Sequence, residues 1–252
     1  MAIIIAVEGN IGSGKSTLVD FLKRTYSNSN IMGRDVIFIQ EPVNEWASIT
    51  DIDGEGILEK FYKDQEQWSF SFQMMAYISR LALLKDAVKS NPNSIIFTER
   101  SLFTDKNVFA QMLFDDNKIS KIDFSIYNKW FHHFIDEVSI SGIVYLQSDP
   151  VICNERVIKR NRPGEQIPLA YLTKCHDYHD KWIMSDKNET PNKIVIDCNI
   201  DHNDQPDILI QWFNKINSFV AYIISSNNYS AKMDHMLGSK VEGTIDRMLS
   251  KD

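Results

Sequence analysis

Five short runs of the chain are rich in isoleucine and valine. They span Ile3 to Glu8, Val36 to Glu41, Ser94 to Glu99, Gly142 to Gln147, and Lys193 to Cys198. Longer stretches with helical spacing of apolar residues lie between them, for example Phe70 to Val88. Strands that are buried on both faces read as continuous apolar runs, and their alternation with helices is typical of a doubly wound sheet. The pattern predicts an α/β fold with a five-stranded parallel sheet flanked by helices.

The apolar pattern weakens toward the end of the chain, from about Ala221, where polar residues dominate. No internal repeat or low-complexity linker interrupts the preceding part. We therefore predict one domain over residues 1–220, followed by a peripheral helix or a partly ordered tail over residues 221–252.

Composition narrows the class of protein. Apolar residues make up 43% and charged residues 24% of the 252 residues, as in an ordinary globular protein. The formal net charge of −7 and a pI of about 5.4 argue against nucleic acid as the main partner. Cys153, Cys175 and Cys198 have no paired spacing, so the sequence indicates neither a disulfide framework nor a zinc site.

The three cysteines without paired spacing favour a reducing compartment. Strand-like sequence begins at Ile3, which leaves no room for a signal peptide, and the longest apolar run near the end, FVAYII, is too short to cross a bilayer. We expect a cytoplasmic protein with no membrane partner.

The stretch GNIGSGKST fits the pattern G-x-x-x-x-G-K-[ST] and lies between a predicted strand and a helix-like run. Its glycines allow backbone N–H groups to face an anion at the positive end of the helix dipole. Lys15 can reach the outer phosphates, and Ser16 supplies a hydroxyl for Mg²⁺. A glycine-rich turn that binds nothing is the alternative, but strand, loop and helix all agree. The predicted ATP-binding residues are Gly9, Asn10, Ile11, Gly12, Ser13, Gly14, Lys15, Ser16 and Thr17.

Charged residues also follow the second and third predicted strands. Glu41 ends the second strand, where a carboxylate facing the phosphate loop can accept a proton from a substrate hydroxyl. Considered alone, Glu41 would be interpreted as a surface acid before Pro42. Glu99 and Arg100 end the third strand and resemble a second active-site pair. Ligands in such folds bind beyond the carboxyl ends of the strands, so these residues are expected to converge.

A basic cluster follows in the stretch NERVIKRNRPGEQIPL, Asn154 to Leu169, and the predicted lid covers about residues 154–168. Arg156 and Arg160 share one helix face, and Arg162 follows at the helix end. A solvated charged helix is the usual explanation for such a run. In an acidic chain that holds a triphosphate, an arginine-rich lid over the phosphates is the better interpretation.

From about Ile3 to Asn199 the chain resembles the deoxyribonucleoside kinases, which include deoxycytidine, deoxyguanosine and deoxyadenosine kinases. The resemblance rests on the order and spacing of EGNIGSGKST, EPVNEW, WSFSFQMMAYISR, ERSLFTD, the arginine-rich lid and IPLAYL. It implies a P-loop kinase fold and transfer of the γ-phosphate of ATP, with Mg²⁺, to the 5′-hydroxyl of a deoxynucleoside in nucleotide salvage. It also implies a homodimer formed through paired helices.

The resemblance assigns roles at the phosphate end of the site. Glu41 matches the general base, and Arg100 matches the arginine that orients it and the incoming phosphate. Glu99 and Ser16 match the Mg²⁺ environment, and Lys15 acts on the phosphates. The lid arginines are Arg156, Arg160 and Arg162.

Other roles implied by the resemblance concern the nucleoside. Tyr62 and Glu165 match the pair that holds the sugar 3′-hydroxyl, and Gln73 matches the residue that reads the base edge. A lone amide on an otherwise apolar helix face also needs a partner on physical grounds. The expected apolar walls around the base are Trp46, Phe72 and Phe109. Those three would more often be plain core residues, and their assignment rests on the resemblance.

The lid departs from the family pattern at its acids. Family lids carry two adjacent acids after the last arginine, whereas here Pro163 and Gly164 precede a single acid, Glu165. Which family acid Glu165 replaces stays open.

Three positions near Gln73 separate the branches of the family. The cytidine and purine branch has a small residue, an arginine and an aspartate there, which this chain matches with Ala76, Arg80 and Asp105. We expect a buried Arg80–Asp105 pair whose spare donors and acceptors face the base, and a preference for a purine deoxynucleoside or deoxycytidine over thymidine. A purely structural salt bridge is the alternative.

Two other functions share parts of this signature. A nucleoside monophosphate kinase such as thymidylate kinase has the same phosphate loop, but Glu41 would repel the phosphate of its acceptor. A nucleotide-dependent switch protein would hydrolyse slowly without an acceptor, and the chain lacks an N-K-x-D guanine motif, since NKIN ends in the wrong residue.

Overall fold

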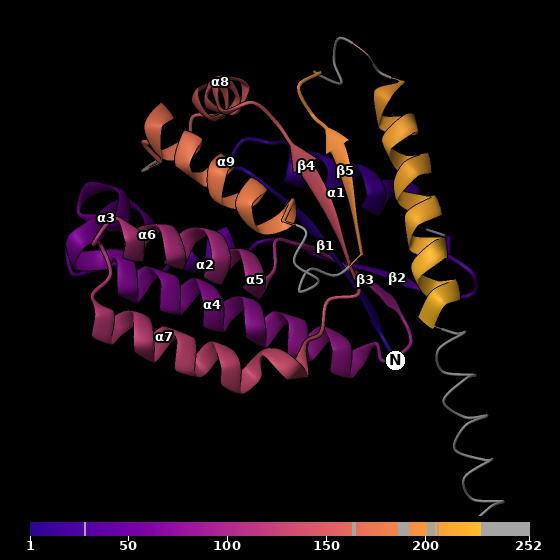
Figure 1. The fold of residues 1–252 in the computed structure, drawn as a ribbon, viewed down its shortest axis with the longest axis horizontal. Coiled ribbons are helices and arrows are strands. Elements are labelled where there is room, and N and C mark those ends of the chain that lie inside the picture. Colours follow the sequence, from indigo (N-terminus) through magenta and orange to yellow (C-terminus); the bar gives the residue numbers. More distant parts are fainter. Residues whose placement is uncertain (28, 163–164, 186–191, 201–204, 206, 228–252) are drawn as a thin grey trace, which may run out of the picture.

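Five parallel strands form the centre of the fold (Figure 1). In the computed structural model, the described residues are 1–27, 29–162, 165–185, 192–200, 205 and 207–227. The strands are β1 (Ile3–Gly9), β2 (Val36–Ile39), β3 (Ile95–Glu99), β4 (Gly142–Gln147) and β5 (Asn192–Asp197), in the spatial order β2-β3-β1-β4-β5. All five predicted strands are confirmed. β2 ends two residues before Glu41, because Pro42 restricts the residue before it and caps the next helix.

Helices connect the strands and cover both faces of the sheet. They are α1 (Lys15–Thr25), α2 (Val43–Ala47), α3 (Ile57–Lys63), α4 (Gln65–Ser90), α5 (Leu102–Thr104), the π-helix η1 (Asp105–Ala110), α6 (Gln111–Asp115), α7 (Lys121–Phe134), the 3-10 helix η2 (Ile135–Glu137), α8 (Pro150–Arg160), α9 (Leu169–Ile183) and a helix over residues 208–227. Among the described residues, no helix is both long and apolar enough to cross a membrane.

Side chains of β1 alternate between two apolar cores. Ile3, Ile5 and Val7 pack with α1 and helix 208–227, whereas Ile4 packs with Ile96 of β3 against α4 and α7. Figure 1 shows α4 and α7 below the sheet, and helix 208–227 alongside β5. A strand whose two faces are both covered needs apolar residues at every position, which explains the continuous run at the start of the chain.

Helix 208–227 continues past residue 220, where the sequence predicts the end of the domain. Ile223 and Ile224 are both 1% exposed and belong to the same core as β1 and α1. The helix, as far as residue 227, is thus part of the helical layer that covers this face of the sheet. Residues 228–252 of the predicted tail lie outside the described residues, and the division at 220 stays a prediction.

Gly142, at the start of β4, provides a test of this packing. A Cβ atom on Gly142 would lie 2.4 Å from Ile223 Cδ1 and 2.9 Å from Phe219 Cζ. We expect Gly142→Ala to lower the free energy of unfolding by about 1–3 kcal/mol, because both side chains would have to move within a packed core. Urea denaturation measures the change.

Gly56 is the matched control, because a Cβ atom there meets nothing closer than 3.8 Å and its φ is −75°. The prediction fails if Gly142→Ala is no less stable than Gly56→Ala.

Candidate active site

The residues predicted to carry chemistry meet at one edge of the sheet. Glu41 follows β2, Glu99 ends β3 and the phosphate loop follows β1, so the order of the strands places them in sequence along this edge. A cavity of about 620 Å³ opens there. All of the predicted site residues except Gly9, Asn10 and Arg80 line it. The sheet topology therefore brings segments far apart in the sequence into one site.

The phosphate loop is packed against helix α8, which carries the first two lid arginines. Gly12 has a φ of +83°, and a Cβ atom there would lie 2.4 Å from the carbonyl oxygen of Cys153 in α8. A side chain at this position would push the helix away from the loop. The glycine thus allows the contact that holds Arg156 and Arg160 beside the loop.

Lys15 crosses the inside of the loop. Its Nζ donates to the carbonyl oxygens of Gly9 (3.0 Å) and Asn10 (2.6 Å), and its side chain is largely buried. Burial, with the neighbouring positive charge of Arg100, lowers the pKa of Lys15 to about 7. The ammonium is held over the loop by carbonyl dipoles that a phosphate can replace.

Gly9 and Asn10 are the first residues of the loop, and they do not line the cavity. Asn10 Nδ2 donates to the carbonyl oxygen of Leu172 at 2.9 Å, and its Oδ1 accepts from the N–H of Ile11 at 2.8 Å. The side chain of Asn10 therefore braces the loop against α9.

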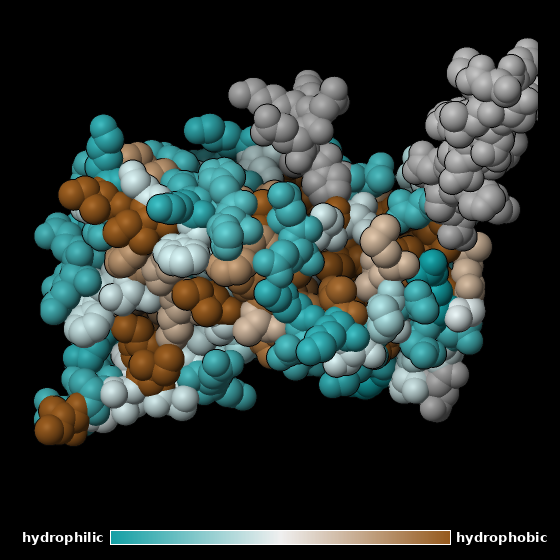
Figure 2. Space-filling view, turned by 90° about the horizontal axis from the view of Figure 1, so that it is seen from below, coloured by the Kyte–Doolittle hydropathy of each residue, from teal (hydrophilic) through white to brown (hydrophobic). Residues whose placement is uncertain are grey.

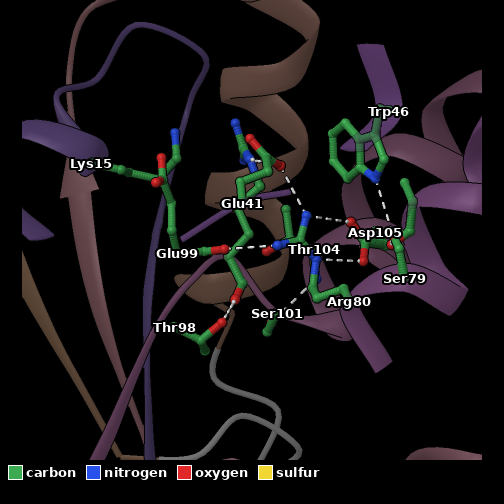
Figure 3. Close-up of polar contacts among 12 residues, drawn as sticks. Lys15, Glu41, Trp46, Ser79, Arg80, Thr98, Glu99, Ser101, Thr104 and Asp105 are labelled. Atoms are coloured by element: carbon green, nitrogen blue, oxygen red, sulfur yellow. Dashed lines mark hydrogen bonds and ion pairs between the residues drawn. The ribbon is translucent and has the colours of Figure 1, made fainter. Parts of the chain in front are cut away.

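Glu41 lies between two buried arginines (Figure 3). Its Oε1 is 2.8 Å from Arg80 Nη2 and 3.3 Å from Arg100 Nε. Burial acts to raise the pKa of Glu41, but the charges of Arg100, Arg80 and Lys15 outweigh burial and lower it. The carboxylate is held ionised, as a proton acceptor requires. Sequence reasoning anticipated Arg100 beside Glu41 but not Arg80.

Arg100 is held in an uncommon backbone conformation, with a φ of +65°. Its Nη1 donates to the carbonyl oxygen of Gly9 at 2.9 Å, and its guanidinium lies 4.9 Å from the centre of the Phe109 ring. Non-glycine residues at positive φ cluster at functional sites because the surrounding contacts must maintain them. Phe109, predicted as a wall of the base pocket, thus also supports Arg100.

Ser16 and Glu99 converge at the start of α1. Ser16 Oγ donates to Glu99 Oε1 at 2.7 Å, and both residues line the cavity. Hydroxyl and carboxylate oxygens suit Mg²⁺, which usually takes one or two protein ligands together with phosphates and water. The pair therefore fits the predicted metal environment.

A buried acid that the sequence analysis did not single out positions the segment after β3. Glu8 accepts hydrogen bonds from the hydroxyls of Ser101 and Thr104, and it is 0% exposed. Burial raises the pKa of Glu8. This carboxylate holds the turn that leads from Arg100 to Asp105. Its place directly before the phosphate loop was the available sequence signal.

Aromatic rings form the far end of the cavity. Phe72 packs edge-on against Trp46, with ring centres 5.7 Å apart, and stacks on Phe61 at 4.6 Å. Trp46 Nε1 donates to Ser79 Oγ at 2.9 Å, which fixes the indole plane. Ala76 lies in the same cluster and leaves space beside these rings. The arrangement fits a flat aromatic ligand.

Gln73 lies among these rings with an open amide. It is 2% exposed and lines the cavity, yet its amide has no hydrogen-bond partner among the described residues. A buried amide without a partner is costly, so a ligand's polar edge is its expected partner. Its role as the residue that reads the base edge stays a prediction.

Arg80 and Asp105 form the predicted buried pair. Arg80 Nε is 2.9 Å from Asp105 Oδ2, and both side chains are almost fully buried. The expectation that spare Arg80 donors face the base needs correction: Nη1 donates to the carbonyl oxygen of Glu99 at 2.7 Å, and Nη2 contacts Glu41. Asp105 lines the cavity, whereas Arg80 lies behind it, because these acceptors draw the guanidinium toward the strand ends.

Several lining residues were not predicted from the sequence. They include Leu58, Phe61, Tyr171, Ile200 and Trp212. Phe61 stands next to Tyr62, so the adjacent aromatic pair was an available signal. Ile200 and Trp212 come from the end of the chain beyond β5, where no local motif marks them. Ile200 follows β5, which is the edge strand on the other side of the sheet from β2.

The lowered pKa of Lys15 predicts how triphosphate binding depends on pH. Lysine is cationic below its pKa, so above about pH 7 the ligand-free protein must take up a proton to present the ammonium to a phosphate. We expect the affinity for ATP to fall by up to about tenfold per pH unit between pH 7 and 9. Calorimetry on the wild type and on Lys15→Met measures it, and equal slopes in the two proteins would contradict the assignment.

Comparison with known proteins agrees with this geometry. A family model described as deoxynucleoside kinase matches residues 5–221. A protein of fowlpox virus named probable deoxycytidine kinase is 38% identical over 196 residues, which is 76% of each chain. Bovine deoxycytidine kinase is 30% identical over 245 residues, covering 86% of this chain and 90% of its own. The mitochondrial deoxyguanosine kinase of Xenopus laevis is 29% identical over 204 residues, covering 73% and 74%. With its phosphate loop, five parallel strands and convergent strand ends, the chain belongs to the deoxynucleoside kinase family.

Proposed function

We propose that this chain transfers the γ-phosphate of ATP to the 5′-hydroxyl of a deoxynucleoside. The observation that carries the proposal is the ionised Glu41, which lies in one cavity with the phosphate loop and an aromatic acceptor end. In this mechanism Glu41 accepts the proton of the hydroxyl, while Lys15, Arg100 and the lid arginines offset the charge of the transferred group. Ser16 and Glu99 would hold Mg²⁺, which would neutralise phosphate charge.

The acceptor end supports an unphosphorylated nucleoside. Its walls include aromatic rings, and its polar groups include Glu41, Gln73 and Asp105, of which two are acids. A nucleoside monophosphate would bring a dianion toward Glu41, which like charge disfavours. A nucleotide-dependent switch protein binds no acceptor and does not need the aromatic acceptor end of the cavity. ADP release with each of the four deoxynucleosides in turn tests the proposal, and release independent of any nucleoside would reject it.

We further propose that the preferred acceptor is a purine deoxynucleoside or deoxycytidine, used in nucleotide salvage. The open amide of Gln73 and the carboxylate of Asp105 present hydrogen-bonding groups beside the aromatic walls, where the small side chain of Ala76 leaves space. Pockets built to bond a ligand reject one that leaves those groups unpaired. The fowlpox and bovine relatives are named as deoxycytidine kinases and the Xenopus relative as a deoxyguanosine kinase.

A cytoplasmic homodimer completes the proposal. Ile122, Ile126 and Trp130 are exposed at spacings of four along α7, and Ile78 of α4 is 52% exposed. Figure 2 views this side of the molecule and shows apolar areas among hydrophilic ones. Paired helices from a second copy would cover this face. The buried free thiols of Cys153, Cys175 and Cys198 support a reducing compartment.

Replacing Glu41 with glutamine separates catalysis from binding. Glutamine can still accept hydrogen bonds from Arg80 and Arg100 but cannot take the proton, so we expect kcat to fall by about 10²-fold or more while the nucleoside still binds. Steady-state kinetics and calorimetric nucleoside titration give the two quantities. Glu45→Gln, an exposed acid on α2, is the control. A loss confined to KM would make Glu41 a binding residue.

Base preference is tested at the buried pair. Arg80→Met with Asp105→Ala removes both charges together, so neither is left unpaired. We expect kcat/KM for thymidine to rise relative to deoxycytidine, deoxyadenosine and deoxyguanosine, because the carboxylate no longer faces the base. Arg100 remains to hold Glu41. Thymidine as the best substrate of the unmodified protein would overturn the preference, though not the wider activity.

A further inference from the structure

Glu165, the single acid that follows the last lid arginine, is paired with the lid arginines. Arg160 Nη2 donates to Glu165 Oε2 at 2.5 Å, and Arg162 Nη1 lies 3.7 Å from Oε1. The side chain of Glu165 is 4% exposed, whereas those of the two arginines are each 35% exposed. A carboxylate so enclosed holds its partners more firmly than a surface ion pair does.

Glu165 also belongs to the acceptor side of the site. It lines the same cavity as Tyr62, and burial followed by the negative charge of Glu165 raises the pKa of the Tyr62 phenol. The carboxylate therefore lines the cavity together with Tyr62 while it pairs with the arginines. One side chain stands between the nucleoside end of the cavity and the cations expected to hold the triphosphate.

The remaining acids of the cavity are engaged elsewhere. Glu41 pairs with Arg80 and Arg100, Asp105 pairs with Arg80, and Glu99 accepts from Ser16. Among the described acids that line the cavity, Glu165 is the one paired with the lid. A triphosphate that enters the phosphate loop must compete with this carboxylate for Arg160, since a guanidinium binds carboxylate and phosphate oxygens in the same way.

We infer that Glu165 is a positioning residue that holds Arg160 back from the donor phosphates until the acceptor's sugar engages the carboxylate. The second part of this inference rests on the proposed function. A sugar hydroxyl that donates to Glu165 offers the carboxylate a neutral partner and weakens its hold on Arg160. Arg160 is then free for the triphosphate, so that each substrate strengthens the binding of the other. A second acid after the last lid arginine, absent here, would divide these two tasks.

Glu165→Gln tests the competition directly, with inorganic tripolyphosphate as the probe and no nucleoside present. We expect tripolyphosphate to bind about fivefold or more tightly to Glu165→Gln than to the wild type, because Arg160 no longer has to leave a carboxylate. Structural damage would weaken binding, so a gain cannot arise from misfolding. Calorimetry measures the affinity, and a thermal melt confirms the fold.

Two further variants separate pairing from net charge. Glu155→Gln removes an exposed acid from the same lid segment, and we expect it to change the affinity by less than about twofold. In an Arg160→Gln background, Glu165→Gln should lose most of its effect, since the paired cation is gone. An equal gain in that background, or unchanged or weaker tripolyphosphate binding in Glu165→Gln alone, would overturn the inference.

The link to the acceptor has its own measurement. Saturating deoxynucleoside should raise the tripolyphosphate affinity of the wild type and leave that of Glu165→Gln unchanged. An equal rise in both proteins would overturn the link. Failure of the proposed function is seen separately, as absence of deoxynucleoside-dependent ADP release from the wild type.

Discussion

The buried guanidinium of Arg80 joins the parts of the chain from which the site is built. From α4 it reaches Asp105 at the start of η1, the carbonyl oxygen of Glu99 at the end of β3, and Glu41 beyond β2 (Figure 3). A charge with 2% exposure is tolerated only when opposite charges and hydrogen-bond acceptors surround it. That requirement sets the position of α4 across the strand ends. It also fixes the carboxylate of Glu41, and Arg80 thereby connects the proposed base-selecting acid, Asp105, with the proposed proton acceptor, Glu41.

Charge is distributed along the edge of the sheet in an order that follows the strands. Acids with buried cationic partners lie at the β2 and β3 end, and the phosphate loop with Lys15 lies at β1 in the middle. The arginines of α8 follow on the β4 side. An acceptor hydroxyl and a triphosphate can therefore meet at the centre, each facing groups of suitable charge. Glu165 is the exception, an acid within the cationic part, and it carries the inferred communication between the two substrates.

Much of this was predictable because the relevant signals are local. The phosphate loop is a contiguous motif between a strand and a helix, and the five strands are continuous apolar runs. Both were predicted, and the predicted bounds of the strands differ from the observed ones by at most two residues. The strand ends also indicated Glu41, Glu99 and Arg100, because a parallel sheet places all of its carboxyl ends at one edge. Ala76 and Arg80 follow Gln73 at helical spacing, so their common face could be predicted too.

The sequence by itself determined the layers of the fold and the phosphate loop, because helical and strand periodicity and turn chemistry act over short distances. Tertiary structure alone decided which partners the buried charges take. Arg80 donates to Glu41 and to the Glu99 carbonyl oxygen rather than facing the cavity. Glu8 accepts hydrogen bonds from the hydroxyls of Ser101 and Thr104, and Glu165 pairs with the lid arginines. Helix 208–227 likewise brought Trp212 into the lining of the cavity. The physical reason is that a buried charge takes the nearest opposite charge or hydrogen-bond partner in space, whatever the separation of the two residues along the chain.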